Sequence, residues 1–361
     1  MHVLKPSQLT ILPTSQCNAR CAHCSMNSGP ERRGERLTFE RMRKAVDELH
    51  QRSPLRVVIF AGGEPLLLGE HLLDAIAHCD SLGILTRIVT NASWAKTYEG
   101  ARKTLNRLRD AGLAELNISC DDYHLPFIPF ERVETAWRAS KGLGFWAVII
   151  ANCHGPGSKI TPDYIMERLG EDLPMRFDEE GYQRPLGRSE ADGTYYGLSN
   201  AQVQLLGRGN QELDPSVLVY RDDDESRLAG GCRWALRSAA LSPNNHLLAC
   251  CGMEVEHNAV LDFGNVDERD AGDIAEEADD LLLLNAVALL GPKFLKDFVK
   301  ERAPEIVWRP RYSTVCEICE HVVKRADVMA VLHKHLWELA AHVWAVRGEL
   351  EREQAKVPEK A

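Results

Sequence analysis

Three cysteines stand within eight residues near the beginning of the chain, at Cys17, Cys21 and Cys24. Their spacing is C-x3-C-x2-C, and the next cysteine along the chain is Cys79. Structural zinc sites usually close with four ligands, so three thiols on one short segment suit that role poorly. Thiolates are also the ligands that iron–sulfur clusters prefer. Three of them would leave one iron of a four-iron cluster free to bind and activate a substrate.

Two other interpretations of this segment remain open. His23 lies between Cys21 and Cys24 and offers a fourth zinc ligand, although a short loop can hardly turn all four side chains inward. Alternatively, the cysteines are buried apolar side chains, because free cysteine often behaves as a small hydrophobe.

A second group of cysteines lies toward the C-terminus. Cys316 and Cys319 form a C-x2-C pair, which we interpret as a tight chelating loop. The segment "PNN" at 243–245 predicts a turn between two strand-like runs. Alone, the pair is compatible with zinc, with a redox couple or with no ligand at all. The whole group comprises Cys232, Cys250, Cys251, Cys316 and Cys319.

Length and composition exclude several classes of protein. The 361 residues, 44% of them hydrophobic and 27% charged, suffice for one large domain or two ordinary ones. The net charge of −10 argues against a general binder of nucleic acids or anionic membranes. No apolar run of about 18 residues predicts a membrane span, and the N-terminus lacks the features of a signal peptide. We therefore expect a cytoplasmic protein, in which free or metal-bound thiols outnumber disulfides.

Strand-like and helix-like segments alternate through the first half of the chain. Helical periodicity is clear in Phe39, Met42, Val46 and Leu49, after the possible N-cap Thr38. Such alternation predicts a parallel α/β sheet with helical crossovers. Strands are expected within 8–14, 55–65, 85–91, 113–124 and 145–155, with a sixth at 200–209.

The pattern changes after about residue 210. An acidic segment precedes the second cysteine group, and two helices are expected near 279–303. A long amphipathic helix is expected near 321–352, packed on the outside of the sheet domain or in contact with a partner.

The segment "CNARCAHC" resembles the cluster-binding loop of the radical S-adenosylmethionine (radical SAM) enzymes. His23 takes a position that is commonly aromatic in that family. "FAGGEPLL" at 60–67 resembles the family's GGEP motif, whose backbone contacts the amino group of SAM. Glycine permits a close backbone approach there, and Pro65 stiffens the exit.

The same resemblance implies further SAM contacts at the ends of later strands, where parallel α/β folds bind ligands. Ser119 and Asp121 match the serine and acidic residue near the ribose, and Arg208 approaches the carboxylate of SAM. The implied SAM-binding set is His23, Gly62, Gly63, Glu64, Pro65, Asn91, Ser119, Asp121 and Arg208.

The second cysteine group resembles the C-terminal extensions called SPASM and twitch, which bind auxiliary iron–sulfur clusters. "PNNHLLAC" matches the family's hairpin, with Asn245 in place of a glycine, a substitution that a left-handed turn tolerates. That register makes Cys250 the ligand and Cys251 the spare. Structural zinc on the same thiols is the alternative. The resemblance implies one auxiliary [4Fe-4S] cluster on Cys232, Cys250, Cys316 and Cys319.

The resemblance also implies the architecture. We expect a partial (β/α)6, TIM-like barrel as the radical SAM core, closed by a smaller SPASM/twitch-like α+β domain. The expected boundaries are 1–210 for the core, 211–230 for a linker, 231–325 for the auxiliary-cluster domain, and 326–361 for an amphipathic helix and tail.

The implied activity is reductive cleavage of SAM to a 5′-deoxyadenosyl radical, which abstracts a hydrogen atom from the substrate. The expected substrate is a peptide that becomes crosslinked, epimerised or oxidised. A small molecule or cofactor precursor is the alternative substrate, and a non-catalytic iron–sulfur or zinc protein is the alternative of another class. The expected partners are an electron donor such as flavodoxin or ferredoxin and a separate recognition protein, because no leader-binding domain precedes Cys17. No acid or base is singled out.

Overall fold

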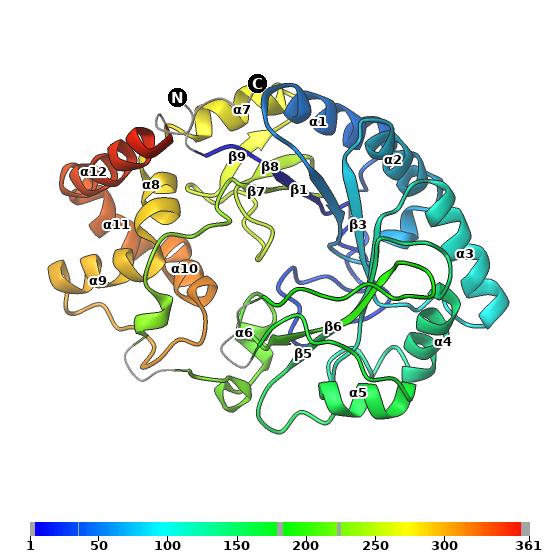
Figure 1. Ribbon diagram of the computed structural model, residues 1–361. Helices are drawn as coiled ribbons and strands as arrows, with labels where there is room; N and C mark the ends of the chain where they lie inside the picture. The colour runs from blue at the N-terminus through cyan, green and yellow to red at the C-terminus, as the bar shows by residue number, and fades with distance from the viewer. Residues whose placement is uncertain (1–3, 35, 179–182, 222–224, 355–361) are drawn as a thin grey trace.

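One continuous sheet runs through the computed structural model, which describes residues 4–34, 36–178, 183–221 and 225–354 (Figure 1). The strand order in this described part is β6-β5-β4-β3-β2-β1-β7-β8-β9. Neighbouring strands from β6 to β7 are parallel, whereas the β7–β8 and β8–β9 pairs are antiparallel. The strands are β1 (Gln8–Ile11), β2 (Val57–Phe60), β3 (Leu85–Thr90), β4 (Glu115–Ser119), β5 (Ala147–His154), β6 (Tyr195–Gln202), β7 (Ser238–Leu241), β8 (His246–Leu248) and β9 (Asp262–Asn265).

Five helices cover the outer face of β1–β6, as Figure 1 shows. Threonine side chains cap three of them: Thr38, Thr97 and Thr161 each accept a backbone N–H of the first turn. The curved parallel sheet with its outer helices confirms the predicted partial (β/α)6 barrel. These helices are α1 (Phe39–Arg52), α2 (Glu70–Ser81), α3 (Tyr98–Asp110), α4 (Phe130–Ser140) and α5 (Pro162–Leu169).

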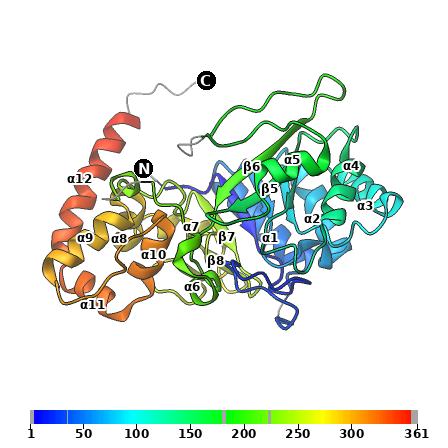
Figure 2. The same ribbon diagram turned by 90° about the horizontal axis from the view of Figure 1, so that it is seen from below.

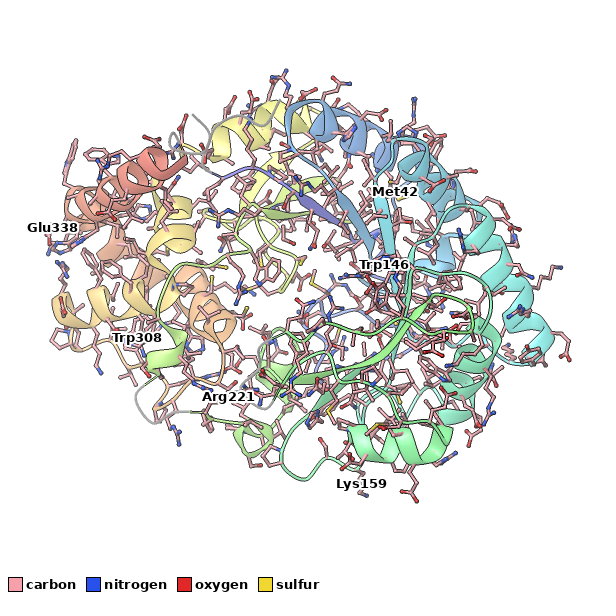
Figure 3. All side chains as sticks on the ribbon, in the orientation of Figure 1. Met42, Trp146, Lys159, Arg221, Trp308 and Glu338 are labelled. Atoms are coloured by element: carbon pink, nitrogen blue, oxygen red, sulfur yellow. The ribbon has the colours of Figure 1, made fainter. Side chains whose placement is uncertain are left out.

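The core between the sheet and these helices takes every second strand residue. Met42 of α1, labelled in Figure 3, is fully buried in it. Leu116 and Ile118 of β4 belong to the same core. Because side chains alternate along a strand, Ser119 faces the inside of the barrel. Strand ends therefore deliver polar side chains to the interior.

The sixth strand lies earlier than predicted. It spans Tyr195–Gln202 rather than 200–209, because all eight of its residues pair with β5, from Ala147–Tyr195 to His154–Gln202. The apolar run after it is buried but not a strand, since the backbone N–H of Leu205 donates to Glu317 rather than to a neighbouring strand. Arg208 therefore precedes the short helix α6 (Gly209–Glu212) rather than ending a strand.

The C-terminal part begins with the predicted hairpin, and Asn245 adopts the expected left-handed conformation with φ of 66°. Of the helices that follow, the first packs mainly against the first apolar core, and the others surround a second one. The helices are α7 (Ala271–Ala278), α8 (Leu282–Asn285), the π-helical turn η4 (Ala286–Leu290), α9 (Pro292–Arg302), α10 (Val315–Lys324), α11 (Ala326–Lys334) and α12 (Leu336–Gln354). Short 3-10 turns elsewhere are η1 (Pro65–Leu68), η2 (Pro215–Val217) and η3 (Ser226–Leu228).

The predicted single tail helix is wrong. Breaks at Arg325 and His335 divide it into α10, α11 and α12. In the described residues α12 packs on α8, α11 and η4 and not on the outside of the barrel (Figure 2). Arg347 holds it there by donating to the carboxylate and the backbone carbonyl of Asp279, at 2.8 and 2.6 Å.

The predicted domain boundaries at 210, 230 and 325 stay a prediction, and the end of the tail, 355–361, lies outside the described residues. In the part of the chain that the structure describes, no helix is long and apolar enough to cross a membrane.

Candidate cofactor-binding site

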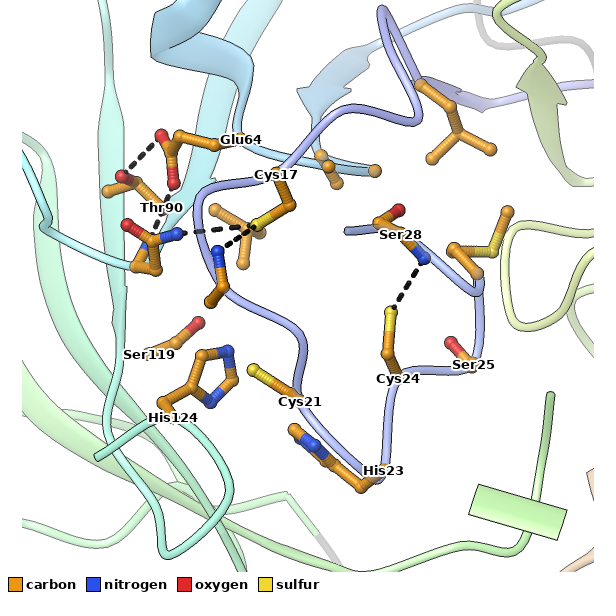
Figure 4. A pocket seen from close by; sticks show the side chains of 18 of the residues that line it. Cys17, Cys21, His23, Cys24, Ser25, Ser28, Glu64, Thr90, Ser119 and His124 are labelled. Carbon is orange, nitrogen blue, oxygen red and sulfur yellow. Dashed lines mark hydrogen bonds between the residues drawn. The ribbon is translucent and has the colours of Figure 1, made fainter. Parts of the chain in front are cut away.

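The cysteine loop follows β1 and borders a cavity of about 280 Å³ (Figure 4). Backbone hydrogen bonds shape the loop: Cys17 donates to the carbonyl of Gly29 at 3.1 Å, and Cys24 donates to that of Cys21 at 3.1 Å. All three cysteines line the cavity, together with residues from the ends of β2, β3 and β4.

Donors already surround two of the three sulfurs. The backbone N–H of Ala19 lies 3.4 Å from the sulfur of Cys17, and the side-chain amide of Asn91 lies 3.5 Å from it. The N–H of Ser28 lies 3.4 Å from the sulfur of Cys24. Hydrogen bonds of this kind stabilise metal-bound thiolates. Burial raises the pKa of the Cys17 thiol to about 12, so it ionises only when a metal displaces its proton.

The three thiols suit an iron–sulfur cluster by their chemistry, because thiolates are the ligands that such clusters prefer. Backbone N–H donors lie 3.4 Å from the sulfurs of Cys17 and Cys24, as they do around metal-bound thiolates. The sulfur of Cys21 also lies within 4.8 Å of ring nitrogens of His23 and His124, so these three side chains could hold a single ion.

The glycine loop after β2 is locked against the cysteine loop. Gly63 and Glu64 donate their backbone N–H groups to the carbonyls of Thr14 and Gln16, at 2.9 and 3.0 Å. Gly62 has a φ of 100°, and a Cβ on Gly63 would lie 2.0 Å from the carbonyl oxygen of Gln16. The glycines therefore permit a close approach to the chain's own cysteine loop.

The carboxylate of Glu64 joins the ends of β2 and β3. It accepts hydrogen bonds from the Thr90 hydroxyl at 2.7 Å, the Asn91 N–H at 2.9 Å and the Leu66 N–H at 3.3 Å. Burial raises the pKa of Glu64, and these hydrogen bonds oppose the rise. Glu64 thus anchors the loop that borders the cavity.

Beyond β4, Asp121 is buried and engaged by histidines. Both of its carboxylate oxygens lie 2.9 Å from Nδ1 of His124, and His23 Nε2 lies 3.5 Å away. Burial would raise the pKa of Asp121, but His124 and then His23 lower it to about 2. Burial lowers the pKa of His23 to about 4, and the ring of His23 stacks on Tyr123 at 4.7 Å.

Arg208 supports the cysteine loop through hydrogen bonds to its backbone carbonyls. Its side chain is 4% exposed, and its guanidinium donates to the carbonyls of Cys21 and Ser28, at 2.9 and 2.8 Å. Its backbone N–H donates to the carbonyl of Cys24 at 3.0 Å. These contacts orient the loop. They also mean that the guanidinium already has hydrogen-bond acceptors in the protein itself.

Sequence reasoning gave His124 and Cys251 no role at this cavity, although both line it. His124 follows Asp121 by three residues in "CDDYH", which is a usable signal, and Cys251 adjoins the expected ligand Cys250. Of the nine residues expected to contact SAM, six line the cavity and the other three do not. Those that line the cavity are His23, Gly62, Gly63, Glu64, Asn91 and Ser119, whereas Pro65, Asp121 and Arg208 lie outside its lining.

The second group of thiols is gathered from distant segments. Burial raises the pKa of Cys319 well above its usual value, followed by the charges of Cys250, Cys316 and Cys232. Burial raises the pKa of Cys316 to about 12, followed by Cys232, Cys251 and Glu317. The thiols of the second group therefore lie near one another in the fold.

Cys316 and Cys319 lie in the first turns of α10, so the expected chelating loop is wrong. Thr314 caps this helix by accepting the N–H of Glu317 at 3.4 Å, and the spacing of three places both thiols on one face. The helix N-terminus also favours thiolates.

Buried Glu317 joins α10 to the barrel domain. Its carboxylate accepts the backbone N–H of Leu205 and that of Ser313, both at 2.9 Å. On the other side, Cys251 lines the cavity that holds the first three cysteines. One thiol of the second group therefore lines the cavity of the first group.

Comparison with known proteins agrees with this geometry. Residues 11–155 match the Radical SAM superfamily. YydG of Bacillus subtilis (strain 168), named for peptide biosynthesis, is 25% identical over 35% of this chain and 40% of its own length. The PqqA peptide cyclase of Methylocella silvestris is 22% identical over 76% of this chain and 75% of its own. The chain thus spans less than half of the first relative.

A solved structure shows the same fold. Native anSMEcpe with bound AdoMet superposes with a TM-score of 0.50 at 14% sequence identity, covering 93% of this chain and 100% of the other. The matched segment and the cysteine loop agree with each other: residues 11–155 resemble a radical SAM domain, and the solved structure supports the fold.

Proposed function

We propose that the protein is a radical SAM enzyme that modifies a peptide, by crosslinking, epimerisation or oxidation, with the help of an auxiliary cluster. The observation that carries the proposal is the position of Cys251, which lines the cavity of the first three thiols beside a member of the second group. A substrate in that cavity would lie between two metal centres. The names of two relatives, a peptide biosynthesis protein and a peptide cyclase, support the peptide.

Cys17, Cys21 and Cys24 would hold the first [4Fe-4S] cluster, and SAM would occupy the cavity beside it. When bound, this pair supplies a radical able to take a hydrogen atom from an unactivated C–H bond. His23, Gly62, Gly63, Glu64, Asn91 and Ser119 are proposed SAM contacts because they line the cavity. His23 Nδ1 is buried and has no partner in the described chain, which supports a ligand there.

The protein's own contribution is to position and shield. Glu64 fixes the glycine loop to β3, and Pro65 begins the turn that continues it. Arg208 and the glycine loop hold the cysteine loop from two sides. Because these donors are already in place, they need not reorganise when the charge of the bound cluster changes.

Four thiols are proposed to bind the auxiliary [4Fe-4S] cluster. Both adjacent cysteines lie near the other thiols, since Cys250 raises the pKa of Cys319 and Cys251 raises that of Cys316. The N–H of Gly252 lies 3.2 Å from the sulfur of Cys250, and this donor supports Cys250 as the ligand. The proposed ligands are Cys232, Cys250, Cys316 and Cys319.

The proposal includes an electron donor such as flavodoxin or ferredoxin, a separate peptide-recognition protein and a cytoplasmic location. Reducing conditions there would keep both thiol groups available for iron.

The test uses the anaerobically reconstituted enzyme with dithionite, SAM and a short peptide encoded beside its gene. We expect 5′-deoxyadenosine together with a mass change in the peptide, both measured by mass spectrometry. The matched control replaces Cys17, Cys21 and Cys24 by alanine. Absence of 5′-deoxyadenosine from the wild type would refute radical chemistry. Its formation with an unmodified peptide, but with turnover of a small molecule, would refute only the peptide substrate.

A further inference from the structure

A buried carboxylate–histidine pair lies beside one of the cluster cysteines. Asp121 is 1% exposed, and both of its oxygens contact Nδ1 of His124 at 2.9 Å. The same carboxylate accepts the backbone N–H groups of Tyr123 and His124, at 3.0 and 2.9 Å. Three nitrogens thus contact Oδ1, while Oδ2 shares the contact with Nδ1 of His124 and lies 3.5 Å from Nε2 of His23. Groups of the protein itself therefore engage both oxygens of Asp121.

The contact with Asp121 fixes the orientation of the His124 ring. Because Asp121 engages Nδ1, Nε2 is the nitrogen that is available for a further contact. Figure 4 shows this ring between Ser119 and Cys21, and His124 lines the cavity. One ring nitrogen, the sulfur of Cys21 and a nitrogen of His23 lie within 4.8 Å of one another.

We propose that Asp121 and His124 are positioning residues of the first cluster. Asp121 orients the ring, and His124 donates Nε2–H to the sulfur of Cys21. This inference rests on the proposed function, because it requires a cluster on Cys21. A donor near a cluster sulfur stabilises the reduced, more negative state and so raises the reduction potential. The pair has the geometry of the carboxylate–histidine units that orient metal ligands.

The decisive measurement is the midpoint potential of the first cluster in the reconstituted full chain without SAM. Electron paramagnetic resonance monitors the reduction of the cluster during the titration. We expect His124→Phe and Asp121→Asn to lower this potential, and His124→Gln, whose amide can still donate, to restore part of it. Asp122→Asn is the matched control, because that neighbouring carboxylate accepts the N–H of Lys159 at 2.9 Å instead. Its potential should equal that of the wild type.

The competing role of Asp121 predicts a different pattern. If Asp121 binds the ribose, Asp121→Asn weakens SAM binding and leaves the potential without SAM unchanged, which would overturn the inference. Unchanged potentials in both His124 variants would overturn it too. Should His124→Phe lose its iron, His124→Gln and Asp121→Asn still decide the question.

Metal content separates this inference from the proposed function. Cys21, His23 and His124 could instead hold a single ion. One zinc per chain, lost in His124→Gln, together with no 5′-deoxyadenosine from the wild type, would refute the cluster and with it the inference. A wild type that cleaves SAM while the variants keep its potential would refute the inference alone.

Discussion

The two thiol groups are built in opposite ways. The first lies on one loop, and its supports are backbone atoms and buried side chains that come from the glycine loop and Arg208. The second is assembled from a loop, a hairpin and the start of α10, with Cys232 tied to Val287 by a backbone hydrogen bond of 3.1 Å. A site on one loop is readable as a short motif, whereas a site assembled by tertiary packing depends on the whole C-terminal fold.

The largest expected effect separates the two groups directly. Replacing Cys17, Cys21 and Cys24 together by alanine should abolish 5′-deoxyadenosine formation and leave about four of about eight iron atoms per chain. Replacing Cys232, Cys316 and Cys319 should remove a similar amount of iron while SAM cleavage persists. Iron analysis and chromatography of 5′-deoxyadenosine measure both. If the second variant also stopped SAM cleavage, the two groups would not be separable.

The next effect distinguishes adjacent thiols. Cys250→Ser should lose the iron of the auxiliary cluster, whereas Cys251→Ser should keep it, because the sulfur of Cys250 accepts the N–H of Gly252 at 3.2 Å, as metal-bound thiolates do. Iron content and the electronic absorption spectrum of each variant decide the matter. The reverse result would exchange the roles of the two thiols.

A third effect concerns the contact between the loops of the first site. Gly63→Ala places a methyl group against the carbonyl of Gln16 and should lower the free energy of unfolding by about 1–3 kcal/mol. Thermal denaturation measures the loss. Gly187→Ala is the control, since a Cβ there meets nothing within 4 Å. Equal melting temperatures for both variants would contradict the locked arrangement.

The smallest effect concerns the hydrogen bonds that Arg208 donates to the cysteine loop. Arg208→Gln removes charged donors from two loop carbonyls and should weaken SAM binding or turnover about tenfold. The exposed pair of Arg20 and Glu212, at 2.7 Å, provides the contrast. Arg20→Gln should change stability and SAM affinity little, because exposed ion pairs contribute about 0–1 kcal/mol. Calorimetric titration measures the affinity of both variants for SAM. Similar affinities would show that SAM binding does not need the hydrogen bonds of Arg208.

Local patterns predicted much of this molecule. Five strands, their helices and the cap Thr38 follow from periodicity and capping chemistry, and the motif residues of the first site come together at the strand ends. Strand β6 was misplaced because its polar residues become a strand only through pairing with β5. The role of α10 as the carrier of two thiols was missed for a related reason: a two-residue spacing fits a loop or a helix equally well.

The side chains behind the cavity were the least predictable. Nothing in the residue types indicates that Arg208 faces the carbonyls of Cys21 and Ser28, or that Asp121 faces His124. Those pairings depend on how far a loop folds back after its strand, which tertiary packing decides. The residue types indicate which side chains can bind a ligand, whereas tertiary packing determines which protein groups those side chains contact.

The parallel pairing of β1 with β7 has a consequence for how this protein can be divided. An uncovered edge strand presents unpaired N–H and carbonyl groups that recruit other chains. β7 occupies that edge of β1, and it also precedes the loop that carries Cys250 and Cys251. The segment that carries the second thiol group thus also pairs with the edge of β1. A truncation that removed this segment would expose β1 as an edge strand, whereas a point mutation of one of its cysteines would leave that edge paired.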